Sequence, residues 1–471
     1  MKLPFLSLLA ALSSAFAAQV TVLGLNDMHA NIDALPRLAT FLRAEREARP
    51  GVLLMSAGDN RTGNPYVDNV PESGMPMIEL MNKLGFDIST LGNHEFDAGP
   101  DQLRDCVNAA NFPFVCANVR TVSGPELKIA PYHFFERDGV RICVLGLVQT
   151  GHNGLPDAHP DQLKNFRFRS PLSSTVLDYT CLREHCDVLI LLTHMGFEDD
   201  ILLAKWFPQA DAIIGGHTHT RVEGGHIENG VLITQAENKV KYITRLTFEV
   251  EDGRVVSKQA ELIPLADVPA DEEMLAAVDA VKNMPYMQRQ LTTVSKDITR
   301  RESLGCMMAD ALRACAGTDV AIVNMGNVRL EEFPAGPFTV ADCYRLDPFC
   351  NQTVIVNVTG RELISFLNVI PAGDHHGAPC VSGMRYQAVK PAAESQPMRI
   401  TSATLEDGTP IQPDATYTMA TNSYLMSVVT PLPADPGRAI DLDGARSMIQ
   451  HLDGKPEIDY SNVSRVEVTI E

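Results

Sequence analysis

Short apolar runs alternate with amphipathic segments through the first half of the chain. Residues 35–48 and 76–85 place apolar positions at helical spacing, and 35–48 carries charged residues on its other face. The apolar runs between and beyond them occupy residues 20–25, 51–57, 87–92, 141–148, 187–192 and 212–216. Buried strands separated by amphipathic helices predict a layered α/β domain whose sheet is largely covered on both faces.

The pattern changes after residue 230. Residues 231–255 read as strands that meet at a turn with Asp252 and Gly253 at its tip. A charged helical stretch flanked by prolines then predicts a linker helix. Beyond it, helices around 302–316 and 360–367 and strands at 319–324 and 353–358 predict an α+β unit. We therefore expect a first domain at 19–265, a linker helix at 266–290 and a smaller second domain at 291–471.

The first residues have the features of an export signal. One lysine is followed by an apolar stretch and then by Ala15-Phe16-Ala17, a small-x-small cleavage pattern. The apolar stretch is too short for a membrane span. No cysteine follows it to carry a lipid, and the last residues contain no hydrophobic anchor. We expect a signal peptide at 1–18 and a periplasmic or secreted protein without a stable membrane anchor.

Composition and charge narrow the range of partners. A chain of 471 residues with 45% hydrophobic and 21% charged residues fits two soluble globular domains. The net charge of −20 argues against nucleic acids and anionic membranes as partners. An anionic substrate would therefore need local positive charge. The ten cysteines permit disulfides, with Cys106/Cys116 and Cys343/Cys350 close enough in sequence to pair.

Five of the apolar runs end in bursts of polar residues that are suited to binding metal. These segments are LGLNDMH (23–29), LLMSAGD (53–59), STLGNHEFD (89–97), LILLTHMG (189–196) and IIGGHTH (213–219). Ligands bind outside the carboxyl ends of strands in α/β sheets, so the fold would gather these bursts. Oxygen and imidazole donors without thiolates favour Mn, Zn, Co or Fe. The nine candidates are Asp27, His29, Asp59, Asn93, His94, Asp97, His194, His217 and His219.

Each burst alone has an ordinary explanation. An NDxH segment is usually a turn, Asp or Asn after a strand is often a helix cap, and GGHTHT could be a loop. The i, i+2 spacing of Asp27 and His29 points both side chains to one face of an extended chain, as does that of His217 and His219. It is the occurrence of all five bursts in one domain that predicts a metal centre.

The motifs LGLNDMHA, SAGD, LGNHEFDAG, LLTHMGF and GGHTHT resemble the metal motifs of calcineurin-like metallophosphoesterases. With a second domain present, the chain more narrowly resembles the bacterial 5′-nucleotidase and 2′,3′-cyclic phosphodiesterase family, some of whose members hydrolyse nucleotide sugars. The resemblance implies a layered metallophosphoesterase β-sandwich flanked by helices, followed by a smaller α+β domain. It also implies two divalent metal ions.

The resemblance assigns the polar residues to roles. One ion would be held by Asp27, His29, Asp59 and His219, and its partner by Asp59, Asn93, His194 and His217, with Asp59 shared. His94 resembles the family's transition-state stabiliser and could donate a proton to the leaving group. Asp97 would orient the His94 ring, unless it is the N-cap of the helix that follows.

The second domain should determine the substrate. NMGNVR (324–329) and DPFCN (347–351) resemble segments that hold the substrate's anionic group and stack on its base. They make Arg329, Asn324 and Phe349 the candidate contacts, although Arg329 could be an ordinary surface arginine and Phe349 a core residue. Further candidates are Tyr424 and Arg313. The segment around Tyr424 lacks the family's usual Gly-Gly-Asp-Gly run, and Asn327 and Ala30 stand where glycines are usual.

These features together predict an exported two-metal phosphohydrolase. We expect it to cleave nucleoside 5′-monophosphates for nucleotide salvage. One alternative is a related enzyme that acts on cyclic nucleotides, nucleotide sugars or another phosphate or sulfur ester. Another is a surface protein that binds metal or nucleosides without turnover. The native metal, the oligomeric state and the disulfide pairing stay open.

Overall fold

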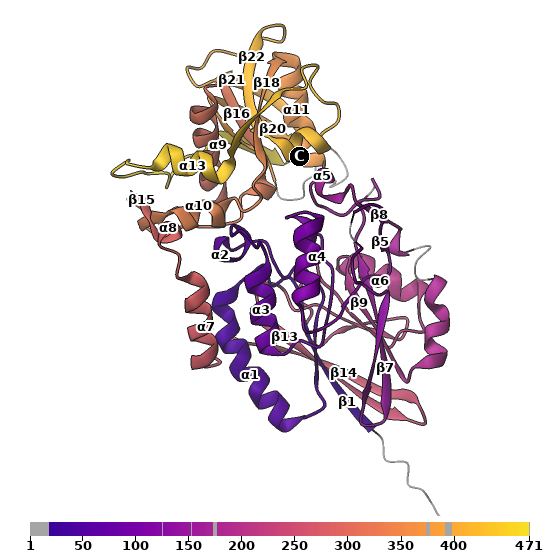
Figure 1. Ribbon diagram of the computed structural model, residues 1–471. Helices are drawn as coiled ribbons and strands as arrows, with labels where there is room; N and C mark the ends of the chain where they lie inside the picture. The colour runs from indigo at the N-terminus through magenta and orange to yellow at the C-terminus, as the bar shows by residue number, and fades with distance from the viewer. Residues whose placement is uncertain are drawn as a thin grey trace, which may run out of the picture.

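The protein is described here from a computed structural model that covers residues 18–124, 126–151, 153–172, 177–373, 377–390 and 398–470. The expected signal peptide at 1–18 lies outside these ranges except for Ala18, which begins strand β1. Two bodies are joined by a helical connection (Figure 1). We call the part up to Pro264 the first domain and the part from Gln290 the second domain.

The first domain is built on two six-stranded sheets. One has the order β14 (Arg254–Pro264), β13 (Tyr242–Glu251), β1 (Ala18–Leu25), β2 (Leu53–Ser56), β3 (Ile88–Thr90) and β4 (Phe114–Val115). The other has the order β11 (His226–Glu228), β12 (Val231–Thr234), β10 (Ala212–Ile214), β9 (Val188–His194), β7 (Val140–Val148) and β6 (Tyr132–Arg137). A separate pair is formed by β5 (Val119–Thr121) and β8 (Phe166–Phe168).

The two sheets pack face to face and helices cover their outer faces. Val22, Met55, Val144 and Ile190 belong to the apolar cluster between the sheets. The first domain's helices are α1 (Leu35–Ala48), α2 (Pro65–Asp68), α3 (Met75–Leu84), α4 (Pro100–Ala109), α5 (Pro160–Leu163) and α6 (Phe197–Trp206), with 3-10 turns η1 (Ile32–Ala34), η2 (His94–Phe96) and η4 (Leu177–His185). The predicted layered sandwich with covered faces is therefore confirmed.

Parallel pairing brings the polar bursts to one edge. Strands β1 to β4 pair in parallel, and so do β7, β9, β10 and β12. Their carboxyl ends consequently face the same side of the sandwich. The β13–β14 hairpin turns where the sequence predicted, with Glu251 paired to Arg254.

The connection between the domains consists of α7 (Glu272–Lys282) and α8 (Pro285–Gln288). The Asp271 side chain caps α7 by accepting a bond from the main-chain N–H of Met274 at 2.8 Å. Helix α7 lies alongside α1 (Figure 1), and Arg43 forms an ion pair with Asp271. The connection is therefore packed onto the first domain.

The second domain combines sheets and helices, as expected. Its main sheet has the order β19 (Cys380–Ser382), β16 (Val320–Val323), β22 (Thr416–Asn422), β18 (Gln352–Thr359) and β23 (Arg438–Asp443). Smaller sheets are formed by β21 (Arg399–Leu405), β20 (Met384–Lys390) and β24 (Val466–Ile470), and by β15 (Gln290–Val294) and β17 (Gly336–Thr339). The helices are α9 (Arg301–Ala316), α10 (Val340–Leu346), α11 (Gly360–Gly373), α12 (Ser423–Val428) and α13 (Gly444–Leu452), with the turn η5 (Met325–Asn327).

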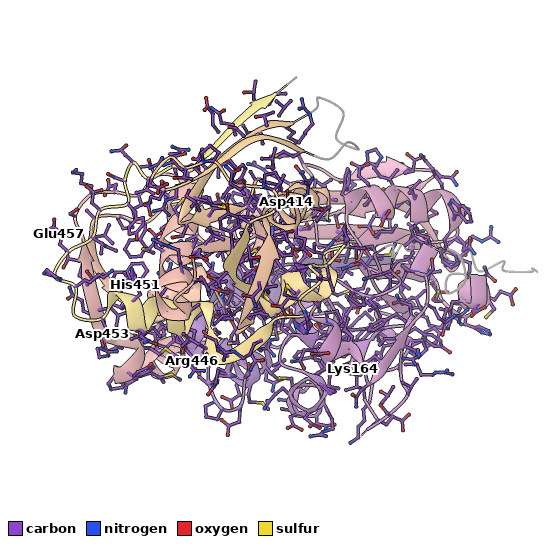
Figure 2. All side chains as sticks on the ribbon, turned by 90° about the horizontal axis from the view of Figure 1, so that it is seen from above. Lys164, Asp414, Arg446, His451, Asp453 and Glu457 are labelled. Atoms are coloured by element: carbon purple, nitrogen blue, oxygen red, sulfur yellow. The ribbon has the colours of Figure 1, made fainter. Side chains whose placement is uncertain are left out.

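The surface of the second domain carries part of the acidic excess. Asp414, Asp453 and Glu457 are exposed on it (Figure 2). All ten cysteines are free, so neither of the two pairs that sequence spacing permits forms a disulfide. Cys343 is buried, whereas Cys350 lies at the surface and accepts a bond from Asn69 Nδ2 at 3.1 Å. None of the helices in the described ranges has the length and apolar character that a bilayer crossing requires.

Candidate metal and catalytic centre

The seven predicted metal ligands lie together at the carboxyl edge of the sandwich. Asp27 and His29 follow β1, Asp59 follows β2 and Asn93 follows β3. The remaining three come from the other sheet, where His194 ends β9 and His217 and His219 follow β10. Asp27 and His194 are fully buried, and the others range from buried to partly exposed.

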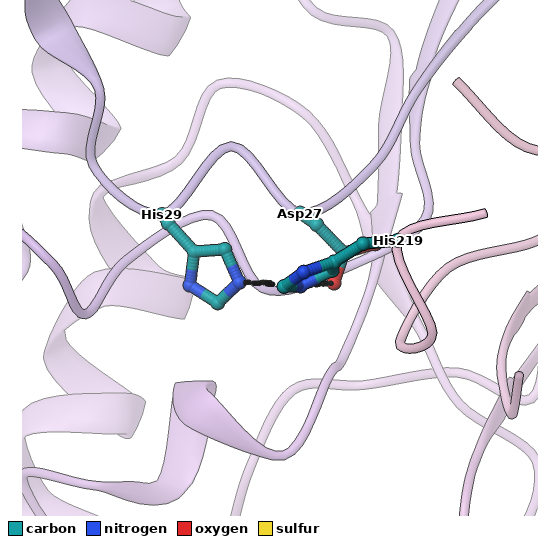
Figure 3. A group of neighbouring side chains, drawn as sticks. All are labelled: Asp27, His29 and His219. Atoms are coloured by element: carbon teal, nitrogen blue, oxygen red, sulfur yellow. Dashed lines mark hydrogen bonds and ion pairs between the residues drawn. The ribbon is translucent and has the colours of Figure 1, made fainter. Parts of the chain in front are cut away.

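One group of ligand atoms surrounds a point next to β1. The Nε2 atoms of His29 and His219 lie 3.0 Å apart, and His219 Nε2 lies 3.3 Å from Asp27 Oδ1 (Figure 3). His29 Nε2 is also 4.0 Å from Asp59 Oδ2. Two lone-pair nitrogens and two carboxylates that face one another at this range can hold a metal ion, and the group has the mixed N/O chemistry of a divalent site.

A second group shares Asp59 with the first. His194 Nε2 lies 3.1 Å from the same Asp59 Oδ2 atom and 3.8 Å from Asp27 Oδ1. The Asn93 Oδ1 atom and His217 Nδ1 lie 3.1 Å apart. Asp59 Oδ2 therefore faces both predicted ligand sets, and it lies closer to His194 than Asp27 Oδ1 does.

Hydrogen bonds on the far side of the rings hold two histidines in the orientation that ligation needs. His194 Nδ1 donates to the Ala57 carbonyl at 2.7 Å, and His29 Nδ1 donates to the Thr62 carbonyl at 3.0 Å. The third ring, that of His219, has its Nδ1 atom 2.9 Å from Asn238 Nδ2. The two bonds to carbonyl oxygens leave Nε2 of His194 and His29 with its lone pair toward the centre. His194 Nε2 is buried and makes no hydrogen bond, and it lies 3.1 Å from Asp59 Oδ2, so the donor chemistry at this point fits a metal ligand.

The pKa shifts of the histidines also fit a metal site. Burial lowers the pKa of His217 to about 4, helped by the charge of His194, and burial also holds the pKa of His29 well below its ordinary value. Both imidazoles are consequently neutral and able to donate a lone pair. Burial opposes the charged form of His194, but Asp59 and Asp27 outweigh it and raise its pKa to about 10. A positive charge is thus favoured between these carboxylates, as a bound cation would supply.

The backbone at the ligands is strained. Asp27, His29, Asp59, His217 and His219 all have positive φ, between +46° and +81°. Non-glycine residues rarely adopt this region, and such strain concentrates at functional sites. Five of the seven predicted ligands share it, so the surrounding structure fixes their side chains against a local cost.

Glu95 joins two of the ligand loops. Its carboxylate accepts bonds from the main-chain N–H groups of Asp59, Asn60 and Gly92 at 2.9, 2.8 and 2.6 Å. The two loops approach so closely that a Cβ added at Gly92 would lie 2.1 Å from Asp59 Oδ1. We did not single out Glu95 from the sequence. Its signal was its place between two candidate residues, His94 and Asp97.

His94 and Asp97 form a pair beside this centre. His94 Nδ1 lies 2.7 Å from Asp97 Oδ2, and His94 Nε2 lies 3.9 Å from Asp59 Oδ2. Burial acts to lower the pKa of His94, but Asp97 and Asp59 outweigh it and the net pKa is raised. Asp97 is not the N-cap of the next helix, because Gly99 occupies that position in α4. Of the two sequence interpretations of Asp97, the contact with His94 is the one present.

A cavity of about 230 Å³ lies over this pair, between the two domains. Its second-domain wall includes four of the five predicted substrate contacts: Asn324, Arg329, Phe349 and Tyr424. The guanidinium of Arg329 lies 5.6 Å from the centroid of the Phe349 ring, which is itself 5.9 Å from that of the His94 ring. Arg313 is not among the lining residues and instead donates to Ser382 Oγ at 2.8 Å.

The first-domain wall contains residues that the sequence did not single out. Asp157, Ala158 and His159 line the cavity from the loop before α5. Asp157 Oδ2 lies 3.7 Å from His217 Nε2, and its main-chain carbonyl accepts a bond from Asn93 Nδ2 at 3.1 Å. No motif marked this loop, because it lies outside the five strand ends.

Two family models match the chain in sequence order. Residues 20–221 match the calcineurin-like phosphoesterase model, and residues 280–430 match the model of the 5′-nucleotidase C-terminal domain. The matched ranges contain all seven predicted ligands and all five predicted substrate contacts. The domain order expected from the motifs is therefore the order of these two matches.

Relatives and solved structures agree with the family models. The chain is 29% identical over 422 residues to a 5′-nucleotidase of Vibrio cholerae, a match that covers 75% of each chain. It is 27% identical over 456 residues to endonuclease YhcR of Bacillus subtilis; the match covers 86% of this chain and the chain spans only 37% of that relative's length. The structure of a 5′-nucleotidase precursor from Thermus thermophilus is similar with a TM-score of 0.80 and 25% identity, over 96% of this chain and 99% of that one.

Proposed function

We propose that the chain hydrolyses nucleoside 5′-monophosphates with two bound metal ions. It belongs to the calcineurin-like phosphoesterases that carry a 5′-nucleotidase C-terminal domain. The members of this family are metal-dependent phosphoester hydrolases. We further propose that the chain is exported and acts in nucleotide salvage outside the cytoplasm. One observation carries the proposal. The atoms of two ligand groups share Asp59 Oδ2 directly below a cavity whose opposite wall presents Arg329 and Phe349.

The donor set fits divalent metal ions. Asp27, His29, Asp59 and His219 would hold one ion, and Asp59, Asn93, His194 and His217 the other. Such ions, when bound, would polarise the phosphoryl oxygens and lower the pKa of a water molecule near phosphorus.

The chain's own residues would orient the substrate and move a proton. The Arg329 guanidinium would bind two oxygens of the anionic group at once, because its donors form a planar fork. Asp97 holds His94 Nδ1, so His94 Nε2 faces the substrate and can donate a proton toward the departing oxygen. Phe349 offers a flat apolar surface to a base.

A substrate panel tests the proposal. Mature protein loaded with Mn²⁺ would be offered AMP, a cyclic 2′,3′-nucleotide, UDP-glucose and 4-nitrophenyl phosphate. We expect hydrolysis, followed by chromatographic separation of the products, to be fastest with AMP. Turnover of the aryl ester alone would contradict nucleotide specificity, and no turnover of any ester by metal-loaded protein would support a binding protein instead.

A further inference from the structure

Thr62 touches both halves of the reaction centre, although it is neither a predicted ligand nor a predicted catalytic residue. It lies three residues after Asp59 and is 2% exposed. Its main-chain carbonyl accepts the bond from His29 Nδ1 at 3.0 Å, and its Oγ1 donates to Asp97 Oδ2 at 2.8 Å. One residue therefore contacts a metal-ligand candidate through its backbone and the His94–Asp97 pair through its side chain.

The backbone of Thr62 is strained. Its φ is +67°, and a β-branched residue in this region is a genuine outlier. The conformation brings Cβ close to the carbonyl oxygen, at a cost that glycine avoids. The side chain must therefore make a contribution that glycine cannot make.

The loop around Thr62 is closed by another residue. The Asp68 carboxylate accepts bonds from the main-chain N–H groups of Thr62, Gly63 and Asn64 at 3.0, 2.8 and 2.8 Å. These bonds involve no side-chain atom of Thr62. A change of that side chain should consequently leave the loop, and the carbonyl that holds His29, in place.

The hydroxyl has a specific partner atom. Asp97 Oδ2 accepts the bond from Thr62 Oγ1 and also lies 2.7 Å from His94 Nδ1. Two donors on one oxygen fix the carboxylate relative to the imidazole. Without the hydroxyl, Asp97 could turn and the His94 ring would lose its fixed direction toward the cavity.

We propose that Thr62 is a positioning residue whose hydroxyl fixes Asp97 and, through it, His94. The left-handed backbone is retained because it directs Oγ1 at Asp97. The inference rests on the proposed hydrolytic function and adds a residue to it.

Three substitutions separate the hydroxyl from the strain. Thr62→Ser keeps the hydroxyl, Thr62→Val keeps the branched shape without it, and Thr62→Gly removes both hydroxyl and strain. With 4-nitrophenyl phosphate and Mn²⁺, we expect Thr62→Val and Thr62→Gly to lower kcat about 10-fold with KM within about 2-fold, and Thr62→Ser to retain kcat. Thr62→Gly should nevertheless melt at a higher temperature than Thr62→Val, so that activity follows the hydroxyl and stability follows the backbone.

Two controls sharpen the test. Thr318→Val removes a buried hydroxyl that donates to a main-chain carbonyl in the second domain and should leave kcat unchanged. In an Asp97→Asn background, Thr62→Val should cause no further loss of kcat, because the two residues act as one unit. Metal content should equal that of the wild type in all three Thr62 variants.

An activity-independent measurement keeps the proposal separate from the proposed function. The Nδ1–H proton resonance of His94 should shift in Thr62→Val and remain in Thr62→Ser. An unchanged resonance, a wild-type kcat in Thr62→Val, or a kcat that follows melting temperature would overturn the positioning role. Absence of turnover in the wild-type chain would contradict the hydrolase proposal, while the resonance would still report on Thr62.

Discussion

The two walls of the cavity are built in different ways. On the first-domain side, ligands from five strand ends are tied to neighbouring backbone, as Glu95 ties the Asp59 loop to Gly92. On the second-domain side, Phe349 is half-buried and its ring meets only His94 and Arg329 among the ring and cation–π contacts of the described residues. We therefore expect the chemistry that needs fixed atoms to lie on the first-domain wall, and recognition to lie on a wall where single side chains can change.

The difference has a functional consequence. A change on the first-domain wall should impair every ester, because all substrates would meet the same reacting groups. A change on the second-domain wall should alter which ester is preferred. The predictions below test this division in order of expected effect on turnover.

Removal of the His94 imidazole should have the largest effect. His94→Ala should lower kcat about 10²- to 10⁴-fold for AMP and 4-nitrophenyl phosphate alike, since proton transfer would be lost for both. Metal content, measured by mass spectrometry of the loaded protein, should not fall. A loss of bound metal in this variant would instead make His94 a ligand.

Removal of the Arg329 charge should act mainly on binding. Arg329→Ala should raise KM for phosphate esters about 10- to 100-fold, because bonds to a charged oxygen are lost. Arg313→Ala is the matched control and should leave KM unchanged, since Arg313 does not line the cavity. Equal effects of the two substitutions in steady-state kinetics would contradict the assignment of Arg329.

Removal of the Phe349 ring should distinguish substrates. Phe349→Ala should raise KM for AMP about 10-fold, the size of one base–aromatic stacking contact. It should leave ribose 5-phosphate, which has no base, nearly unaffected, and Phe349→Tyr should retain AMP binding. A similar loss for both substrates would place Phe349 in the phosphate site rather than in base recognition.

The first-domain wall was largely predictable from sequence, because its residues lie in short motifs at strand ends. Parallel pairing of the strands brings Asp27, Asn93 and His217 to one edge. This could be predicted without knowing which distant residues are in contact. Asp157 and Thr62 were not predicted, since their roles depend on a loop position and on a backbone angle that carry no periodic signal. The family resemblance supplied the assignment of the predicted ligands to two ions. The parallel pairing of the strands explains why these residues can lie close together.

The second-domain wall was less predictable for a physical reason. Arg329 and Phe349 were found from short segments, but their contact with each other and with His94 depends on how the two domains meet. Arg313, also a candidate, faces Ser382 and Glu406 instead of the cavity. The disulfide pairing was left open by the sequence, because spacing does not determine whether two side chains face each other.

Two buried carboxylates extend the comparison to stability. Asp347, behind Phe349, has its pKa raised to about 7 by burial and by Asp443, and burial raises that of Asp200, on α6 after His194, to about 8. A folded pKa above the unfolded value gives stability that is present below about pH 4 and lost as the pH rises through 7 or 8. Asp347→Asn and Asp200→Asn should therefore raise the free energy of unfolding at pH 9 by about 1–3 kcal/mol each, and the melting temperature with it, and should raise neither at pH 4.

Calorimetry at pH 4, 7 and 9 checks this prediction. Both variants should flatten the pH dependence of the melting temperature relative to the wild type. kcat should stay close to that of the wild type, because neither carboxylate lines the cavity. A pH dependence unchanged by both substitutions would show that these groups ionise as they do in the unfolded chain.

A metal titration tests the central claim most directly, namely that five strand ends form a two-metal hydrolytic centre around Asp59. Phosphate release from AMP would be measured as Mn²⁺ is added to metal-free protein, with bound metal counted in the same samples. We predict that turnover reaches its maximum at two ions per chain, and that Asp59→Asn neither binds two ions nor turns over AMP. Full turnover at one ion per chain, or in Asp59→Asn, would contradict the account.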